Sequence, residues 1–325
     1  MRAKGESKQG LVSITQAVIL QFKWTFKTPF LRMWGYINWF AMVTLLYVGG
    51  IAIWPSIEYW LPNTTFRGFF LPWATGVVVF FSMLLIFYVV YHLEHPFFEQ
   101  FKSNKLDWPW YSDPHWDAKW RHAMNVTLKN NFIWAPAFSG LLAYGGFGKG
   151  RTTTAEIPSF PVFLAQILFF ILVEELVFYI IHRIMHHPKL YPKLHKIHHE
   201  FNNAVTLAAE YAHPIEYILG NMLPIGVGPT LLFRRFHYLS MLTFLTMRLI
   251  FSVENHCGYD FPWAMTRPLP FESTAHYHNY HHLKNNGNYC SASMIWDSIF
   301  GTNDAYFEEL EQEERGKKNK ANKAI

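Results

Sequence analysis

Residues 182–199 read HRIMHHPKLYPKLHKIHH, and residues 278–282 read HNYHH. These stretches hold three histidine clusters, whose members are His182, His186 and His187, then His195, His198 and His199, then His278, His281 and His282. Neutral imidazole is the commonest protein ligand for first-row transition metals. On a helix, side chains three or four residues apart share one face, so each cluster can direct two or three imidazoles to a common point. The clusters therefore predict a metal-binding protein.

Long apolar segments surround these clusters. Hydrophobic residues make up 51% of the 325-residue chain and charged residues only 16%, against a usual charged share of about 25%. Four segments carry no charge, namely 33–57, 68–91, 130–148 and 157–173. The first two exceed the ~20 residues that cross a bilayer, and the last two are borderline. We expect an all-α integral membrane protein with four transmembrane helices, the fourth ending at His182.

Residues 217–253 contain two further apolar stretches, broken by Pro224, Pro229 and the pair Arg234-Arg235. They predict a hairpin, either spanning or re-entrant. If all clusters face one centre, the chain between the second and third must cross an even number of times, as a hairpin does. Basic residues follow the second span and surround the first two clusters, so the positive-inside rule predicts a cytosol-facing histidine-rich di-metal domain.

The chain divides into three predicted parts. Residues 1–156 form an N-terminal membrane-helical region, 157–307 a catalytic region with the three clusters, and 308–325 a charged, disordered tail. The net charge of +5 suits anionic lipid better than nucleic acid, for which no basic stripe is visible.

The ligand types narrow the metal chemistry. Structural zinc normally needs four ligands, usually including thiolates, and the chain has only Cys257 and Cys290, without a Cys-x2-Cys pair. Iron, zinc, copper and nickel all suit imidazoles. Two metals, each with several imidazoles and an open position, fit this histidine count better than one. Such a pair could reduce dioxygen and attack an unactivated C–H bond, and the membrane setting implies a lipid substrate.

Two acids interrupt the fourth apolar run. Glu174 and Glu175 stand at expected membrane depth, where carboxylates are costly and usually functional. From Glu175, steps of seven and eleven residues reach His182 and His186 on roughly one helical face. We expect a carboxylate that orients the histidines. Alternatively, both acids lie near the interface and pair with Arg183 or Lys149.

The cluster spacings His-x3-His-His, His-x2-His-His and His-x2-His-His resemble the fatty acid hydroxylase/sterol desaturase superfamily. This resemblance runs from about Val173 to Thr302. Within it, four segments are most similar to C-4 methylsterol oxidases. They are 191–201 (YPKLHKIHHEF), 209–216 (AEYAHPIE), 255–262 (NHCGYDFP) and 287–302 (GNY…WDSIFGT).

The resemblance implies an oxygen-dependent, non-haem di-iron monooxygenase of the endoplasmic reticulum membrane. It implies electrons from NAD(P)H through cytochrome b5 and its reductase, and stepwise oxidation of the C-4 methyl group of a sterol. The nine clustered histidines would be metal ligands, with His256 as a tenth. A spacing of five between His182 and His187 would also serve without His186.

Further candidates surround the ligands. Some relatives have a second histidine four residues after His256, where this chain has Asp260, and Asp260 either touches metal or orients a ligand. Glu210 matches a family position without an assigned role. His213 is a candidate pocket residue, ligand or helix cap, and His276 a pocket or ligand-orienting residue.

Two other functions remain open. The same scaffold serves sterol desaturation, sterol side-chain hydroxylation and fatty-acid hydroxylation, which the histidines do not separate. A histidine-lined membrane metal transporter belongs to a different class, since histidines also line ion paths. Transporters need ligands at mid-membrane depth and often show repeated halves, and no repeat is visible here.

Overall fold

The computed structural model describes residues 29–104, 106–146, 149–265, 267 and 271–323, and this part of the chain contains helices and turns but no β-strand. The all-α prediction is therefore confirmed. The longer helices are α2 (Pro29–Trp60), α3 (Thr64–Leu93), α6 (Trp116–Lys129), α7 (Ala135–Tyr144), α8 (Phe160–Met185), α10 (Leu223–Leu232), α11 (Tyr238–His256), α12 (Ala275–Lys284) and α14 (Asp304–Lys323). The short ones are α4 (Pro96–Glu99), α5 (Pro109–Ser112), α9 (Pro214–Glu216) and α13 (Ile295–Phe300).

Three helices in the described part of the chain are long and apolar enough to cross a membrane. They are α2 from Met33 to Trp60, α3 and α8. Large apolar side chains such as Leu45, Val78 and Leu85 are more than 60% exposed on α2 and α3, as a lipid-facing surface requires. Of the three, α8 is the most buried. This position suits the helix that carries Glu174 and Glu175, because charges avoid lipid.

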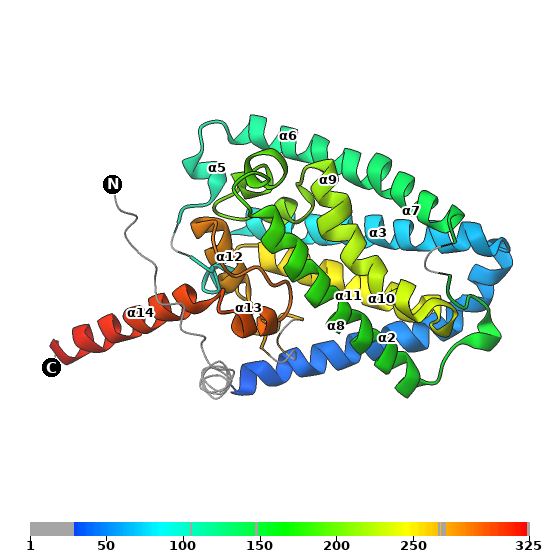
Figure 1. Cartoon of the computed structure of the whole chain (residues 1–325). Helices are drawn as coiled ribbons and strands as arrows, with labels where there is room; N and C mark the ends of the chain where they lie inside the picture. The colour runs from blue at the N-terminus through cyan, green and yellow to red at the C-terminus, as the bar shows by residue number, and fades with distance from the viewer. Residues whose placement is uncertain (1–28, 105, 147–148, 266, 268–270, 324–325) are drawn as a thin grey trace.

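The segment 130–148, predicted as a span, does not reach the same length. Helix α6 continues through a π-helical turn (Asn130–Trp134) into α7, but α6 is charged, and only Asn130–Tyr144 is both apolar and helical. Fifteen residues rise about 22 Å, short of the ~30 Å hydrocarbon core. The α6–α7 helix nevertheless runs lengthwise beside α3 (Figure 1), and Trp73 Nε1 donates to Asn131 O (2.8 Å).

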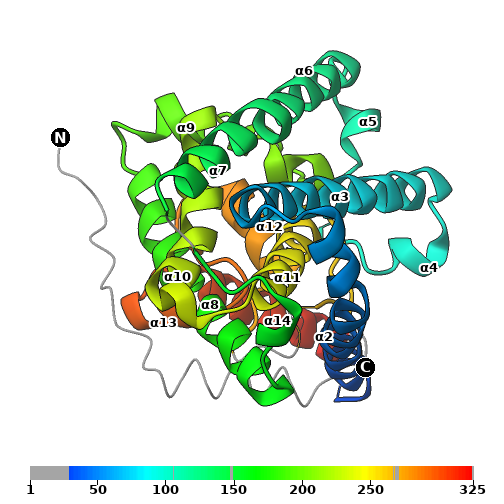
Figure 2. The ribbon, with the colours of Figure 1, turned by 90° about the vertical axis from the view of Figure 1, so that its right-hand side faces the viewer.

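The two apolar stretches of residues 217–253 form the helices α10 and α11, and the membrane hairpin stays a prediction. The chain leaves the α12 end of the molecule along α9 and α10 and returns along α11, which lies centrally (Figure 2). Helix α11 packs against α2, α3 and α8. Phe163 and Phe170 of α8, Val43 of α2 and Phe244 of α11 share one buried core. The N-terminal membrane-helical region and the histidine-bearing region therefore pack around a common helix.

The C-terminal segment differs from its prediction. Instead of a disordered tail, residues up to Lys323 form α14, which projects from the body beside α12 and α13 (Figure 1). Glu and Lys are good helix formers, and a Glu311–Arg315 ion pair (3.1 Å) joins successive turns. Near its start, Tyr306 is buried against Tyr277 of α12. The charged segment is therefore an exposed helix that packs against α12 near its first residues.

Candidate metal centre

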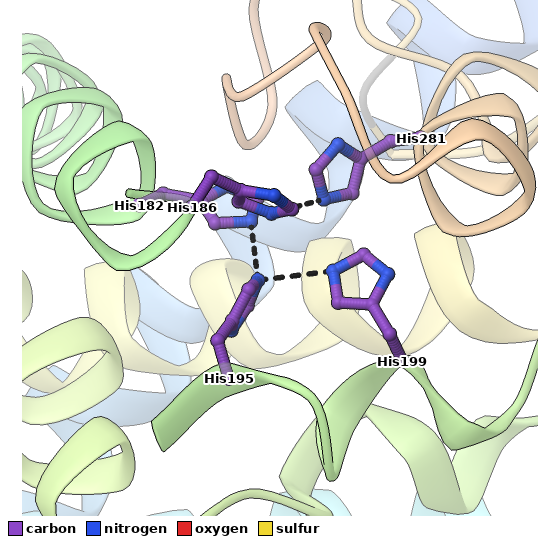
Figure 3. Close-up of side chains that lie close together, drawn as sticks. All are labelled: His182, His186, His195, His199 and His281. Carbon is purple, nitrogen blue, oxygen red and sulfur yellow. Dashed lines mark hydrogen bonds between the residues drawn. The ribbon is translucent and has the colours of Figure 1, made fainter. Parts of the chain in front are cut away.

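Five histidines from three parts of the chain gather in one cluster, called site 1. Its members are His182 and His186 at the end of α8, His195 and His199 in the turn that follows, and His281 on α12. One nitrogen from each lies within 4.8 Å of the others. Figure 3 shows the rings turned toward a shared centre, with His195 Nε2 3.1 Å from His182 Nε2 and 3.0 Å from His199 Nε2.

Four more histidines form site 2, whose members are His198, His256, His278 and His282. The two sites adjoin, since the rings of His199 and His282 have centroids 4.6 Å apart. The second and third clusters are therefore divided between sites. In both of these clusters, the two histidines that stand four residues apart share a site, and the remaining histidine turns to the other site. The sequence predicted that each cluster directs its imidazoles to one point, whereas in the structure the second and third clusters each contribute to both sites.

Hydrogen bonds to the protein fix the protonation of several rings. A carbonyl oxygen only accepts, so Nδ1 carries the proton where it meets Tyr289 O in His182 (2.8 Å), Gly287 O in His281 (2.6 Å) and Ser252 O in His256 (2.6 Å). The same holds for His198 Nδ1 and Tyr211 O (3.3 Å). In a neutral imidazole this leaves Nε2 as a bare lone pair, which is the form that binds metal.

Bare nitrogens then face each other inside both sites. In site 2 the Nε2 atoms of His198 and His256 are 3.3 Å apart, although both must be unprotonated. In site 1 the same applies to His182 and His195, because His195 Nδ1 lies 2.6 Å from Glu216 Oε1. Facing lone pairs repel unless a cation lies between them. Two metal–nitrogen bonds of about 2.1 Å at right angles place the nitrogens about 3.0 Å apart, so the spacing fits metal.

Burial keeps the imidazoles neutral. It lowers the pKa of His198 to about 4 and holds the pKa of His195 and of His278 well below the usual value. Ligand imidazoles must be neutral, so this environment favours metal over proton. The Nδ1 atoms of His199, His278 and His282 have no hydrogen-bond partner in the described residues, and the protein does not fix their tautomers.

Glu216 orients His195 of site 1. Its carboxylate is buried and accepts from His195 Nδ1, the arrangement by which carboxylates hold metal-bound histidines. Gly287 holds His281 of site 1 through its carbonyl. It has φ +76°, and a Cβ there would lie 2.4 Å from Thr302 O, so only glycine fits this turn.

Substituting Glu216 with glutamine should weaken metal binding at site 1 by roughly 10–100-fold, because His195 loses its anionic partner. The measurement is an anaerobic Fe²⁺ titration of the purified protein against a chelator. Glu200→Gln is the matched control, since Glu200 accepts from Tyr211 OH rather than from a histidine. Equal affinity in the two variants would contradict a role for Glu216.

Other predicted site residues lie outside the two sites. His187 is exposed, because five residues from His182 is a different helical face from that of His186. His213 caps α9, its Nδ1 accepting from Ile215 N. Asp260 pairs with Arg267 (2.9 Å), and His276 meets Tyr306 OH (3.0 Å).

The acids of α8 have different partners from those expected. Glu174 pairs with Arg248 of α11 (2.5 Å) rather than with Arg183 or Lys149. Glu175 accepts from the backbone N–H groups of Ala292 (2.6 Å) and Ser293 (3.2 Å), in the loop that also supplies Tyr289 O. Sequence reasoning missed Arg248, although one charge in the apolar stretch 236–253 carried the same signal as Glu174.

A second residue that sequence reasoning missed is Asp297 of α13, which is fully buried. Its carboxylate accepts from four donors, the N–H groups of Tyr289 (2.9 Å) and Cys290 (2.8 Å) and the hydroxyls of Tyr277 (2.8 Å) and Thr302 (2.6 Å). It thereby fastens the 289–290 loop to α12. No spacing or periodicity signals this role.

Two neighbouring cavities lie within the helical body. The smaller borders both sites and is lined by His182, His195, His198, His256 and His278 among others. The larger, of about 140 Å³, lies between α3, α7, α10 and α11. Its wall includes Trp73, Phe138, Leu142, Met241 and Leu245, and Glu210 is one of its polar residues. Asn221, Arg248 and Ser252 line both cavities.

Comparison with known proteins places this chain in a family. The model of the fatty acid hydroxylase family matches residues 167–302. Methylsterol monooxygenase 2-2 of Arabidopsis thaliana is 38% identical over 160 residues, which is 48% of this chain and 59% of that protein. Very-long-chain aldehyde decarbonylase GL1-8 of Oryza sativa subsp. indica is 35% identical over 183 residues, 54% of this chain and 67% of that one. No solved structure matches. Methylsterol monooxygenase 1 of Rattus norvegicus is 33% identical over 212 residues, which is 65% of this chain and 69% of the relative. The chain therefore belongs to the fatty acid hydroxylase family.

Proposed function

We propose that this protein is a membrane oxidoreductase that uses dioxygen to oxidise a sterol at its C-4 methyl group. The observation that carries the proposal is the pair of adjoining imidazole sites beside an apolar cavity. The names of the rat and Arabidopsis relatives support the sterol as substrate.

Nine histidines would hold two iron ions, five in site 1 and four in site 2. Bound iron supplies dioxygen activation, which imidazole cannot perform alone. The chain's own part is to keep the ligands neutral and oriented, through Glu216 and the carbonyls of Tyr289, Gly287 and Ser252. It also surrounds the sites with buried walls that exclude water.

A lipid substrate fits the position of the larger cavity. That cavity lies between helices of a membrane bundle and is lined mainly by apolar side chains, so a sterol can enter it from the bilayer. The wall shared with the smaller cavity brings one end of such a substrate beside site 1 and site 2.

The protein resides, on this proposal, in the endoplasmic reticulum membrane with its metal sites on the cytosolic face. Exposed Lys189, Lys193 and Lys196 surround the histidine turn, which favours the cytosolic side. We assign the α6–α7 helix as the fourth crossing, although its apolar part is short, because it carries the chain from the end of α3 to the start of α8 at the opposite end of the molecule (Figure 1). Electrons come from NAD(P)H through cytochrome b5 and its reductase.

A metal transporter is less consistent with this geometry. The proposed ligands stand at the ends of α8 and α11 and on α12, whereas transport requires sites near mid-membrane. Other lipid oxidations by the same scaffold differ only in which carbon reaches the metal. The sterol-profiling experiment below distinguishes them from oxidation at C-4.

The test is expression in cells that lack their own C-4 methylsterol oxidase, followed by sterol profiling by mass spectrometry. We expect accumulated 4-methylsterols to fall, and a His278→Ala/His281→Ala variant to leave them unchanged. Unaltered 4-methylsterols with normal expression and electron supply would contradict the proposed substrate while leaving the family membership intact.

A further inference from the structure

Arg248 is a buried cation between the two cavities. It is 5% exposed and lies in an otherwise uncharged part of α11, with its guanidinium 5.1 Å from the Phe178 ring centroid. Its Nε donates to Glu174 Oε1, and the described residues supply no other hydrogen bond to it. The terminal Nη1 and Nη2 groups are thus donors without an acceptor in the described structure. Because Arg248 lines both cavities, these donors can bind a polar group that enters either of them.

The surroundings show what kind of group would bind there. Arg248 lines both the larger apolar cavity and the smaller cavity that borders the metal sites. Glu210 lines the larger cavity too, and its buried Oε2 accepts no hydrogen bond from a described residue. A hydroxyl group matches this pair, because it accepts from a guanidinium and donates to a carboxylate. An entirely apolar ligand would leave both unsatisfied.

We propose that Arg248 and Glu210 recognise the hydroxyl group of the lipid substrate and set which of its carbons faces the metal sites. This inference rests on the proposed function and deepens it. In a sterol the 3-hydroxyl stands next to C-4, so holding it at the wall shared by the two cavities directs C-4 toward site 1 and site 2. Glu174 then serves as the counter-ion that holds Arg248 in place.

The test compares the binding of a radiolabelled 4-methylsterol and of its 3-deoxy analogue to the purified, iron-loaded protein in nanodiscs. No electron donor is added, so no turnover occurs. A hydrogen bond to a charged group contributes about 1.5–3 kcal/mol, and we expect the wild type to bind the alcohol at least tenfold tighter. Wild type that binds neither sterol would overturn the proposed function, whereas equal binding of both would overturn only this inference.

Arg248→Met alone would leave Glu174 buried without its partner and destabilise the fold. The informative variant is therefore Glu174→Gln/Arg248→Met, which removes both charges. We expect it to bind the alcohol only as tightly as the deoxy analogue, with affinity for the deoxy analogue unchanged within about twofold. A retained preference for the alcohol, or an equal loss for both sterols, would overturn the assignment.

Arg67→Met is the matched control for loss of a buried arginine. Arg67 is 2% exposed and donates to Thr152 O, at the opposite end of α3 from the metal sites. This variant should keep the wild-type preference for the alcohol, and its loss would overturn the inference. Glu210→Leu tests the second partner. In this variant we expect the alcohol and its 3-methyl ether, which cannot donate a hydrogen bond, to bind equally. A persisting preference for the alcohol would show that Glu210 does not bind the hydroxyl group.

Discussion

Replacing His281 with alanine is expected to remove one of two bound metal equivalents, and replacing His278 is expected to remove the other. The two residues lie one helical turn apart in the same cluster, yet His281 faces site 1 and His278 faces site 2. Loss of a ligand-orienting group costs about 10–100-fold in activity, so loss of a ligand itself should cost more. Elemental analysis of each purified variant, alongside sterol turnover, measures both effects.

His187→Ala is the matched control for these substitutions. His187 belongs to the first cluster but is exposed and outside both sites, so this variant should retain both metals and its activity. Loss of metal from His187→Ala, or full metal content in His281→Ala, would contradict the division of the clusters.

Asp297→Asn is expected to destabilise the fold more than any single histidine substitution. The carboxylate accepts four hydrogen bonds, and an asparagine would turn its NH₂ group toward some of these donors. With charged hydrogen bonds worth about 1.5–3 kcal/mol each, the unfolding free energy should fall by about 4 kcal/mol or more. Thermal unfolding in detergent, followed by circular dichroism, measures this change.

Asp304→Asn controls for the change from carboxylate to amide. Asp304 begins α14, and its Oδ1 has no hydrogen-bond partner in the described residues, so this variant should stay within about 0.5 kcal/mol of wild type. Similar unfolding temperatures for the two variants would show that Asp297 does not hold the 289–290 loop.

The spacing of the histidines predicted that they gather at metal sites, and the structure brings His256 and eight of the nine clustered residues together. The sequence did not predict how the histidines divide between the two sites. Spacing of four identifies residues on one face, but the direction of the third residue depends on where the turn 191–200 and α12 meet. The same limit applies to His187. It belongs to the first cluster in the sequence, but it lies on a different helical face from His186 and therefore outside both sites.

The sequence likewise predicted some features of the membrane segments and not others. Charge-free length correctly located α2, α3 and α8, while the segment 130–148 joins a charged helix and falls short of a full span. The partner of Glu174 was hidden because Arg248 is 74 residues away in sequence. Long-range pairing of this kind follows from helix packing, which a single sequence does not reveal. The division of the chain at residue 156 stays a prediction.

The most direct test of the metal centre is the ratio of metal to sulfur in the purified wild-type protein, measured by inductively coupled plasma mass spectrometry. The chain contains 11 methionines and 2 cysteines, so its sulfur content counts protein molecules without a separate assay. Two adjoining imidazole sites predict two iron atoms for every 13 sulfur atoms. One metal atom per chain, or none after expression with iron in excess, would contradict the two-site centre.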